Sequence, residues 1–309
     1  MSYYGQQNQY KLGIGNDGNT LITLIAVNLI VFVIVALIRV IYFFSYGADE
    51  GTVLFTQQFL NWVTLPAHLP TFITRPWTLL THFILHLDVW HIIANMLWLW
   101  AFGRILQDIS GTSKVIPIFL YGAFAGAVFY MLSFNLIPGL KDGLVHAKAL
   151  GASAGVMAIA IAATALAPGY RIFPLLNGGI PLWVITGIFV IIDLATIPNS
   201  NSGGHIAHLA GAGMGYLFVV MLRRGHDWGN WINNFFDWVN NLFNPDKPKK
   251  GKTIKGQFYY KTTVPPYNRT STTITQQRVD AILDKISQKG YNSLTEEEKE
   301  ILKQASKED

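Results

Sequence analysis

The sequence places a serine and a histidine where the two could act together in nucleophilic catalysis. Ser153 lies in the string GASAG (151–155) at the start of a predicted helix, and His208 begins a His-x-x-Gly-x-x-x-Gly pattern. A serine hydroxyl is a weak nucleophile unless a base within about 3 Å accepts its proton. A helix N-terminus also offers free backbone N–H groups that can stabilise an oxyanion. We therefore interpret Ser153 as the candidate nucleophile and His208 as its candidate base.

Each of these two residues also has a structural interpretation when taken alone. A serine can sit in a small-residue packing face, and a buried histidine can be part of a core. Gly-x-Ser-x-Gly also marks the nucleophile turn of α/β-hydrolases, but no strand precedes Ser153. Pairs of small residues four apart favour close helix packing. Gly151 with Gly155, and Gly211 with Gly215, are such pairs, and helices meeting on these faces would bring the histidine to the serine.

A second polar pair is suited to binding a developing negative charge. His91 and Asn95 are four residues apart and so share one face of a predicted helix. Both can donate hydrogen bonds, and a donor aimed at a tetrahedral oxyanion contributes roughly 3–4 kcal/mol to catalysis. The alternative is a polar clamp between helices, which is worth about 1 kcal/mol.

The remaining polar residues of the apolar segments receive weaker interpretations. We expect Asp193 to make a structural hydrogen bond on the side of the membrane opposite the serine and histidine. His205 lies near the face of His208, and His82 and His86 are expected to organise a loop.

A metal site is a further hypothesis, because imidazole is a good ligand for zinc or iron. The five histidines concerned are His82, His86, His91, His205 and His208. There is no His-Glu-x-x-His string, and no carboxylate is expected near them. We therefore expect neither a metal nor another cofactor.

Composition restricts the class of protein strongly. Of the 309 residues, 51% are hydrophobic and only 13% are charged, whereas soluble domains average about 25% charged residues. These values exclude a disordered chain and an ordinary soluble enzyme. The absence of cysteine excludes disulfides, thiolate ligands and a cysteine nucleophile. The net charge of +5 has much of its basic excess in the C-terminal tail, and we expect no nucleic-acid partner.

Apolar segments predict an all-α membrane protein with six spans, since about 20 apolar residues cross a bilayer. The segments are 20–45, 89–109, 115–136, 152–168, 182–198 and 205–222. They follow a polar N-terminal segment (1–19) and define a core over 20–224. Lys and Arg near the span ends favour a topology with both termini in the cytoplasm. The long connection 46–88 is expected to rest in the membrane interface.

Three further segments follow the core. Residues 225–244 predict an amphipathic helix that lies on the bilayer surface or packs on the protein. Residues 245–277 form a basic flexible linker, which either touches anionic lipid or stays solvated. Residues 278–309 predict a helical hairpin with a capping box from Ser293 to Glu296. Such a small hairpin is a plausible docking site for a cytoplasmic partner.

Taken together, the three motifs resemble those of the rhomboid intramembrane serine proteases. His91-x-x-x-Asn95, Gly151-x-Ser153 and His208-x-x-Gly211-x-x-x-Gly215 fall in the second, fourth and sixth spans, and the tail resembles C-terminal extensions of Bacteroidetes-type rhomboids. The resemblance implies a Ser–His dyad without an aspartate. Ser153 is then the nucleophile and His208 the general base and acid.

The resemblance also implies the surroundings of the dyad and its substrates. His91, Asn95 and the Ser153 backbone N–H would form the oxyanion hole, and Gly151 would let the substrate backbone approach. The substrates would be single-span membrane proteins in the cytoplasmic (inner) membrane of a bacterium, cut near or within their spans.

The sequence departs from the family pattern at four positions. Thr78 follows Trp77 where arginine is common, Ala154 stands where glycine is frequent, Met157 replaces an aromatic that stacks on the histidine, and Gln107 replaces glutamate. These departures leave a second hypothesis, a catalytically weak or inactive rhomboid-like protein that binds client transmembrane helices.

Overall fold

The computed structural model describes residues 20–172, 179–242 and 276–305. The chain divides into two compact units, Met1–Lys247 and Pro248–Asp309. The predicted polar segment 1–19 and almost all of the predicted linker 245–277 lie outside the described residues.

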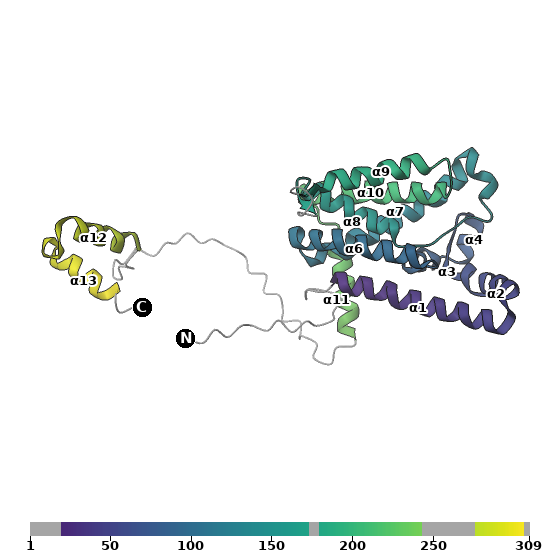
Figure 1. Cartoon of the computed structure of the whole chain (residues 1–309), viewed down its shortest axis with the longest axis horizontal. Helices are drawn as coiled ribbons and strands as arrows, with labels where there is room; N and C mark the ends of the chain where they lie inside the picture. Colours follow the sequence, from purple (N-terminus) through teal and green to yellow (C-terminus); the bar gives the residue numbers. More distant parts are fainter. Residues whose placement is uncertain (1–19, 173–178, 243–275, 306–309) are drawn as a thin grey trace, which may run out of the picture. The chain divides into compact units, whose positions relative to one another are not determined.

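Apolar helices form the bulk of the larger unit (Figure 1). They are α1 (Thr20–Tyr46), α6 (Val89–Ser110), α7 (Val115–Leu136), α8 (Ser153–Leu166), α9 (Leu182–Thr196) and α10 (Ser202–Arg223). Among the described residues, α1, α6, Thr112–Leu136 (which contains α7) and α10 are long and apolar enough to cross a membrane. The chain is therefore an integral membrane protein. Helices α8 and α9 are apolar but have only 14 and 15 residues, so the six-span count stays a prediction.

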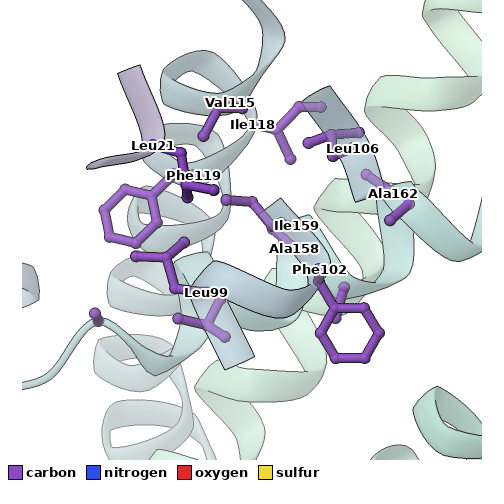
Figure 2. Packing of buried hydrophobic residues seen from close by; sticks show 14 of the residues in the cluster. Leu21, Leu99, Phe102, Leu106, Val115, Ile118, Phe119, Ala158, Ile159 and Ala162 are labelled. Atoms are coloured by element: carbon purple, nitrogen blue, oxygen red, sulfur yellow. The ribbon is translucent and has the colours of Figure 1, made fainter. Parts of the chain in front are cut away.

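Helix α8 lies at the centre of the hydrophobic core. Its apolar side chains pack among residues of α6, α7 and α1, as Figure 2 shows. The labelled core residues are Leu21, Leu99, Phe102, Leu106, Val115, Ile118, Phe119, Ala158, Ile159 and Ala162. Because α8 is buried along most of its length, its first residue is held rigidly.

Close backbone contact joins α10 to α8. A Cβ atom added to Gly211 would lie 2.2 Å from the carbonyl oxygen of Ala154, and one added to Gly215 would lie 2.2 Å from that of Ala158. The expectation that α8 presents Gly151 and Gly155 to α10 is therefore wrong. Gly155 faces α7, where an added Cβ would lie 2.6 Å from the ring of Phe119. In α8, Gly155 lies against the bulky Phe119 of α7, whereas Ala154 and Ala158 lie against the glycines of α10.

The connection between α1 and α6 is mostly short helices. They are α2 (Ala48–Phe55), the π-helix η1 (Thr56–Leu60), α3 (Asn61–Val63), α4 (Leu69–Thr74), α5 (Thr78–Thr81) and the 3₁₀-helix η2 (His82–Ile84), with strand β1 (Leu65–Pro66) after α3. Trp62, Ile73 and Trp77 are exposed, which is typical of a segment in the membrane interface.

Two tryptophans and an arginine anchor this connection. The ring of Trp77 stacks on that of Trp62 at 6.1 Å between centroids, and its indole N–H donates to the Trp62 carbonyl at 2.8 Å. The Arg75 guanidinium lies 4.2 Å from the centroid of the Trp62 ring, a cation–π contact. Thr78 is buried, and its hydroxyl donates to the carbonyl of Arg75 at 2.7 Å. Arg75 thus supplies an anchor although Thr78 departs from the family pattern.

The other short elements connect the helices. They are η3 (Thr112–Lys114), η4 (Pro138–Gly143), β2 (Lys148–Ala149), β3 (Arg171–Ile172) and β4 (Ile180–Pro181). Strands β1 and β2 pair antiparallel, as do β3 and β4.

The amphipathic helix α11 (Asn230–Leu242) belongs to the larger unit and packs against its helix α7. Ile232 is buried, and the Trp231 indole donates to the hydroxyl of Tyr121 in α7 at 2.8 Å. Just before the helix, Asp227 forms an ion pair with Lys114. Phe235, Trp238 and Leu242 remain exposed. One face of the helix therefore packs on the protein, and the face that carries Phe235, Trp238 and Leu242 stays exposed.

The smaller unit contains a helical hairpin of α12 (Gln276–Lys289), η5 (Tyr291–Ser293) and α13 (Glu296–Ala305). The capping box lies two residues later than predicted. The Glu298 N–H donates to the Thr295 hydroxyl at 3.3 Å, and the Thr295 N–H donates to the Glu298 carboxylate at 2.8 Å. Ser293 instead donates to the Gly290 carbonyl at 2.6 Å. Two overlapping Ser/Thr-x-x-Glu strings fit the motif, and the helix starts at the second.

Candidate active site

The candidate nucleophile and base are in direct contact. Ser153 is the first residue of α8, and His208 lies in the second turn of α10. The Ser153 hydroxyl lies 2.7 Å from Nε2 of His208. The tight contact of Gly211 with Ala154 is one turn from this pair. It brings α10 close enough for the imidazole to reach the N-terminus of α8.

Asp193 belongs to the same cluster, which the sequence interpretation missed. Its Oδ1 atom accepts hydrogen bonds from Nδ1 of His208 at 2.9 Å and from Nδ1 of His205 at 2.8 Å. The expectation that Asp193 lies on the opposite side of the membrane is wrong. It sits in the last turn of α9, and the short connection 197–201 sets that turn beside the first turns of α10.

His91 and Asn95 each line a cavity that Ser153 and His208 also line. A Cβ added to Gly151 would lie 2.8 Å from Cε1 of His91, so the imidazole rests against that glycine. Gly151 has φ +117°, a backbone conformation that a side chain would strain. The Asn95 amide donates to the His91 carbonyl at 2.9 Å and has a second N–H to offer.

Two cavities meet at Ser153. The first, of about 280 Å³, is lined by Ser153, His208 and His91, together with Tyr130, Lys148 and Asn201, which the sequence interpretation did not identify. The second lies between α6, α8, α9 and α10, and six of its ten lining residues are apolar. Its lining residues are Asn95, Trp98, Ser153, Val156, Met157, Ala160, Phe189, Ile192, Asp193 and His208. Ser153 thus lines two cavities, one that also has Lys148 and Asn201 in its wall and one that has Trp98 and Phe189.

The backbone before Ser153 is fixed by the connection between α1 and α6. Contrary to expectation, a strand does precede Ser153: β2 has two residues and pairs with β1 in the register Leu65↔Ala149. The Gly151 N–H donates to the His82 carbonyl at 2.9 Å, and the Ala152 N–H lies 3.5 Å from Nε2 of His86. His82 and His86 thus organise this connection, as expected, and they also position the start of α8.

Burial sets the protonation of these two loop histidines. Burial lowers the pKa of His82 to about 4, although Nδ1 donates to the Thr78 carbonyl at 3.0 Å. Burial also lowers the pKa of His86 to about 4, and the neighbouring His91, whose ring centroid is 5.1 Å away, adds to the effect. Both rings are therefore neutral at pH 7 in the folded protein.

We expect acid to destabilise the fold through these histidines. In the unfolded chain a histidine binds its proton near pH 6.5, so stability is full above that pH and falls as the pH drops toward 4. The loss at pH 4 is on the order of 3 kcal/mol for each ring. The thermal midpoint in detergent, measured from pH 7 to pH 4, tests this.

The matched variants are His82→Asn, which keeps a donor for the Thr78 carbonyl, and His146→Asn at an exposed loop position. The first should flatten the acid profile and the second should leave it unchanged. Equal acid profiles for wild type and His82→Asn would contradict the prediction.

The three groups around Asp193 also have the composition of a metal site. Among the described residues, Asp193, His205 and His208 bring their ligand atoms within 4.8 Å of one another. A carboxylate therefore does lie near the histidines, contrary to expectation. However, Oδ1 of Asp193 lies within 2.9 Å of both Nδ1 atoms, which is direct hydrogen-bond contact, whereas metal ligation would need both nitrogens unprotonated. The arrangement favours a hydrogen-bonded cluster.

Two departures from the family pattern have compensating neighbours. A Cβ added to Gly126 of α7 would lie 2.5 Å from the methyl of Ala154, so α7 has a glycine where α8 has the extra methyl. Met157 is buried, and His208 is instead held by Asp193. Gln107 has a buried Nε2 with no hydrogen-bond partner in the described part of the chain. Nothing in the structure explains this third substitution.

Comparison with known proteins agrees with the fold and the motifs. Residues 74–225 match the rhomboid domain family. Residues 267–308, which include the hairpin, match a family of unknown function, DUF6576. The RHOMBOID-like protein 12, mitochondrial, of Arabidopsis thaliana is 32% identical over 160 residues, which cover 48% of this chain and 47% of that protein. The chain thus spans about half the length of this curated relative. The rhomboid domain over residues 74–225 contains Ser153, His208, His91 and Asn95, and the chain belongs to the rhomboid family.

Proposed function

We propose that the chain is an intramembrane serine endopeptidase that cleaves the transmembrane segments of single-span membrane proteins. The observation that carries the proposal is the 2.7 Å contact between the Ser153 hydroxyl and Nε2 of His208. A base at that distance can take the hydroxyl proton as the oxygen attacks a peptide carbonyl.

The surroundings supply the other requirements of acyl transfer. The Ser153 backbone N–H at the start of α8, His91 and Asn95 are candidate donors to the oxyanion of the tetrahedral intermediate. Protonated His208 then gives its proton to the leaving amine. Water attacks the acyl enzyme with the same histidine as base. The cavity lined by Tyr130, Lys148 and Asn201 supplies a polar route for that water.

The apolar cavity supports a membrane-embedded substrate. It is lined by Trp98 and Phe189 as well as the reacting pair, so an apolar span can approach Ser153 between α6 and α9. We place the enzyme in the cytoplasmic membrane of a bacterium with both termini in the cytoplasm, on the distribution of Lys and Arg in the sequence.

The alternative is a rhomboid-like protein that binds client spans without cutting them. Ala154 and Met157, which depart from the family pattern, favour it. Ser153 and His208 are both present and in contact, which favours the protease over the client-binding alternative.

Labelling with a fluorophosphonate probe separates the two. The probe phosphonylates a serine, with loss of fluoride, only where a base activates the hydroxyl, so we expect one adduct on the wild-type protein, located at Ser153 by mass spectrometry. The His208→Ala variant should not be labelled. No adduct on the folded wild type, or equal labelling of the variant, would favour the client-binding alternative.

A further inference from the structure

We propose that Asp193 positions the imidazole of His208, and that His205 holds the Asp193 carboxylate in place, so that this chain works with a Ser–His–Asp triad. The inference rests on the proposed protease function and assigns Asp193 and His205 roles that a two-residue site lacks. Asp193 touches no reacting atom and acts through the histidine, so it is a positioning residue.

The hydrogen bonds form a continuous line from nucleophile to carboxylate. The Ser153 hydroxyl is 2.7 Å from Nε2 of His208, and Nδ1 of the same ring is 2.9 Å from Oδ1 of Asp193. Because a carboxylate only accepts, Nδ1 must carry the proton of the neutral ring. Nε2 then has the free lone pair that can accept the serine proton. The position of Asp193 thus selects the tautomer that acyl transfer needs.

His205 explains how one carboxylate can hold a fixed orientation. Its Nδ1 donates to the same Oδ1 atom at 2.8 Å, and its ring stands nearly perpendicular to that of His208 at 5.9 Å between centroids. The hydroxyl of Thr196, one turn after Asp193 in α9, lies 3.2 Å from the same nitrogen. Two donors on one oxygen restrict rotation of the carboxylate, so the line to His208 keeps its direction.

Burial makes the carboxylate effective. Side-chain exposure is only 9% for Asp193 and 24% for His208, and electrostatic interactions are stronger away from bulk water. During attack, the serine oxygen bonds to the peptide carbon and its proton moves to Nε2. The resulting imidazolium lies between the Asp193 carboxylate and the serine oxygen, and the buried negative charge stabilises it. The proton leaves with the amine when the C–N bond breaks.

The residue at position 157 shows why such support is needed here. An aromatic ring at this position could hold the histidine by stacking, but this chain has Met157, which is buried beside the site. A methionine side chain is flexible and adapts its shape to its neighbours. The hydrogen bond that His208 donates to Asp193 fixes the orientation of the imidazole, which packing against the flexible side chain of Met157 cannot do.

The test compares four variants of the full-length protein in liposomes with a single-span substrate. We expect Asp193→Asn to lower kcat by at least about 100-fold with KM within about twofold, since the comparable change in a soluble triad costs about 10⁴. His205→Asn should give an intermediate loss. Thr186→Val replaces a buried threonine of the same helix α9 whose hydroxyl, within the described part of the chain, donates to carbonyls of that helix, and it should keep kcat within about twofold of wild type. Ser153→Ala measures the background.

The results for Asp193→Asn and Ser153→Ala distinguish failure of the positioning role from failure of the proposed protease function. If Ser153→Ala is inactive while Asp193→Asn keeps kcat within about threefold of wild type, the positioning role is wrong and the protease stands. If Ser153→Ala is active, the proposed function itself is wrong. Should Asp193→Asn fail to fold, ¹⁵N spectra of histidine-labelled wild type decide, with His208→Gln for assignment. The Nδ1-protonated tautomer of His208 is expected, and the Nε2-protonated neutral form would overturn the proposal.

Discussion

Replacing Ser153 with alanine is expected to lower the rate of substrate cleavage by about 10⁶-fold, as loss of a triad serine does in a soluble protease. The change removes the oxygen that lies 2.7 Å from Nε2 of His208 and leaves the imidazole without its proton donor. It should cost little stability, because Ser153 is the first residue of α8 and alanines flank it on both sides. Cleavage of a single-span reporter in liposomes, followed by mass spectrometry of the products, measures the effect.

A second serine serves as the control for this experiment. Ser110 ends α6, and its hydroxyl donates to the Leu106 carbonyl of its own helix at 2.8 Å. Ser110→Ala should therefore cleave like the wild type. A Ser153→Ala protein with a wild-type melting temperature that still cuts within tenfold of the wild-type rate would exclude the serine mechanism.

Features that depend only on residues near one another along the chain could be predicted from the sequence. Apolar runs located the helices that carry the site, and four-residue spacing placed His91 and Asn95 on one helix face. The patterns around Ser153 and His208 likewise predicted that these two residues pair, and the Ser153 hydroxyl lies 2.7 Å from Nε2 of His208. Each of these inferences needs only the helical repeat and the chemistry of the side chains.

Features that depend on how helices meet could not be predicted in this way. Asp193 is fifteen residues from His208, and only the length and course of the connection between α9 and α10 place it at the imidazole. The choice of Ala154 instead of Gly155 as the neighbour of α10 depends on the rotation of α8 about its axis. Amphipathic patterns fix such rotations for a helix with one buried face, but α8 is buried along most of its length.

The same contact between α8 and α10 leads to the second large effect that we expect. Replacing Gly211 with alanine places a Cβ atom 2.2 Å from the carbonyl oxygen of Ala154, which is far below van der Waals contact. Backbone is on both sides of this contact, so the clash can be relieved only by moving α10 away from α8. Overpacking of this kind typically costs about 1–3 kcal/mol. A displacement of about 1 Å at His208 would lower kcat by about 100-fold.

Gly213, two residues further along and on the opposite face of the same turn, offers a control that adds the same methyl group to the same helix. A Cβ added to Gly213 meets nothing within 4 Å, so Gly213→Ala should retain full activity. It should also raise the melting temperature slightly, because alanine favours the helix over glycine by about 1 kcal/mol. The melting temperature and kcat of the two variants are measured side by side. If Gly211→Ala matches Gly213→Ala in both, close approach of α10 to α8 does not hold His208 at Ser153. The position of the base must then be set by its hydrogen bond to Asp193 alone.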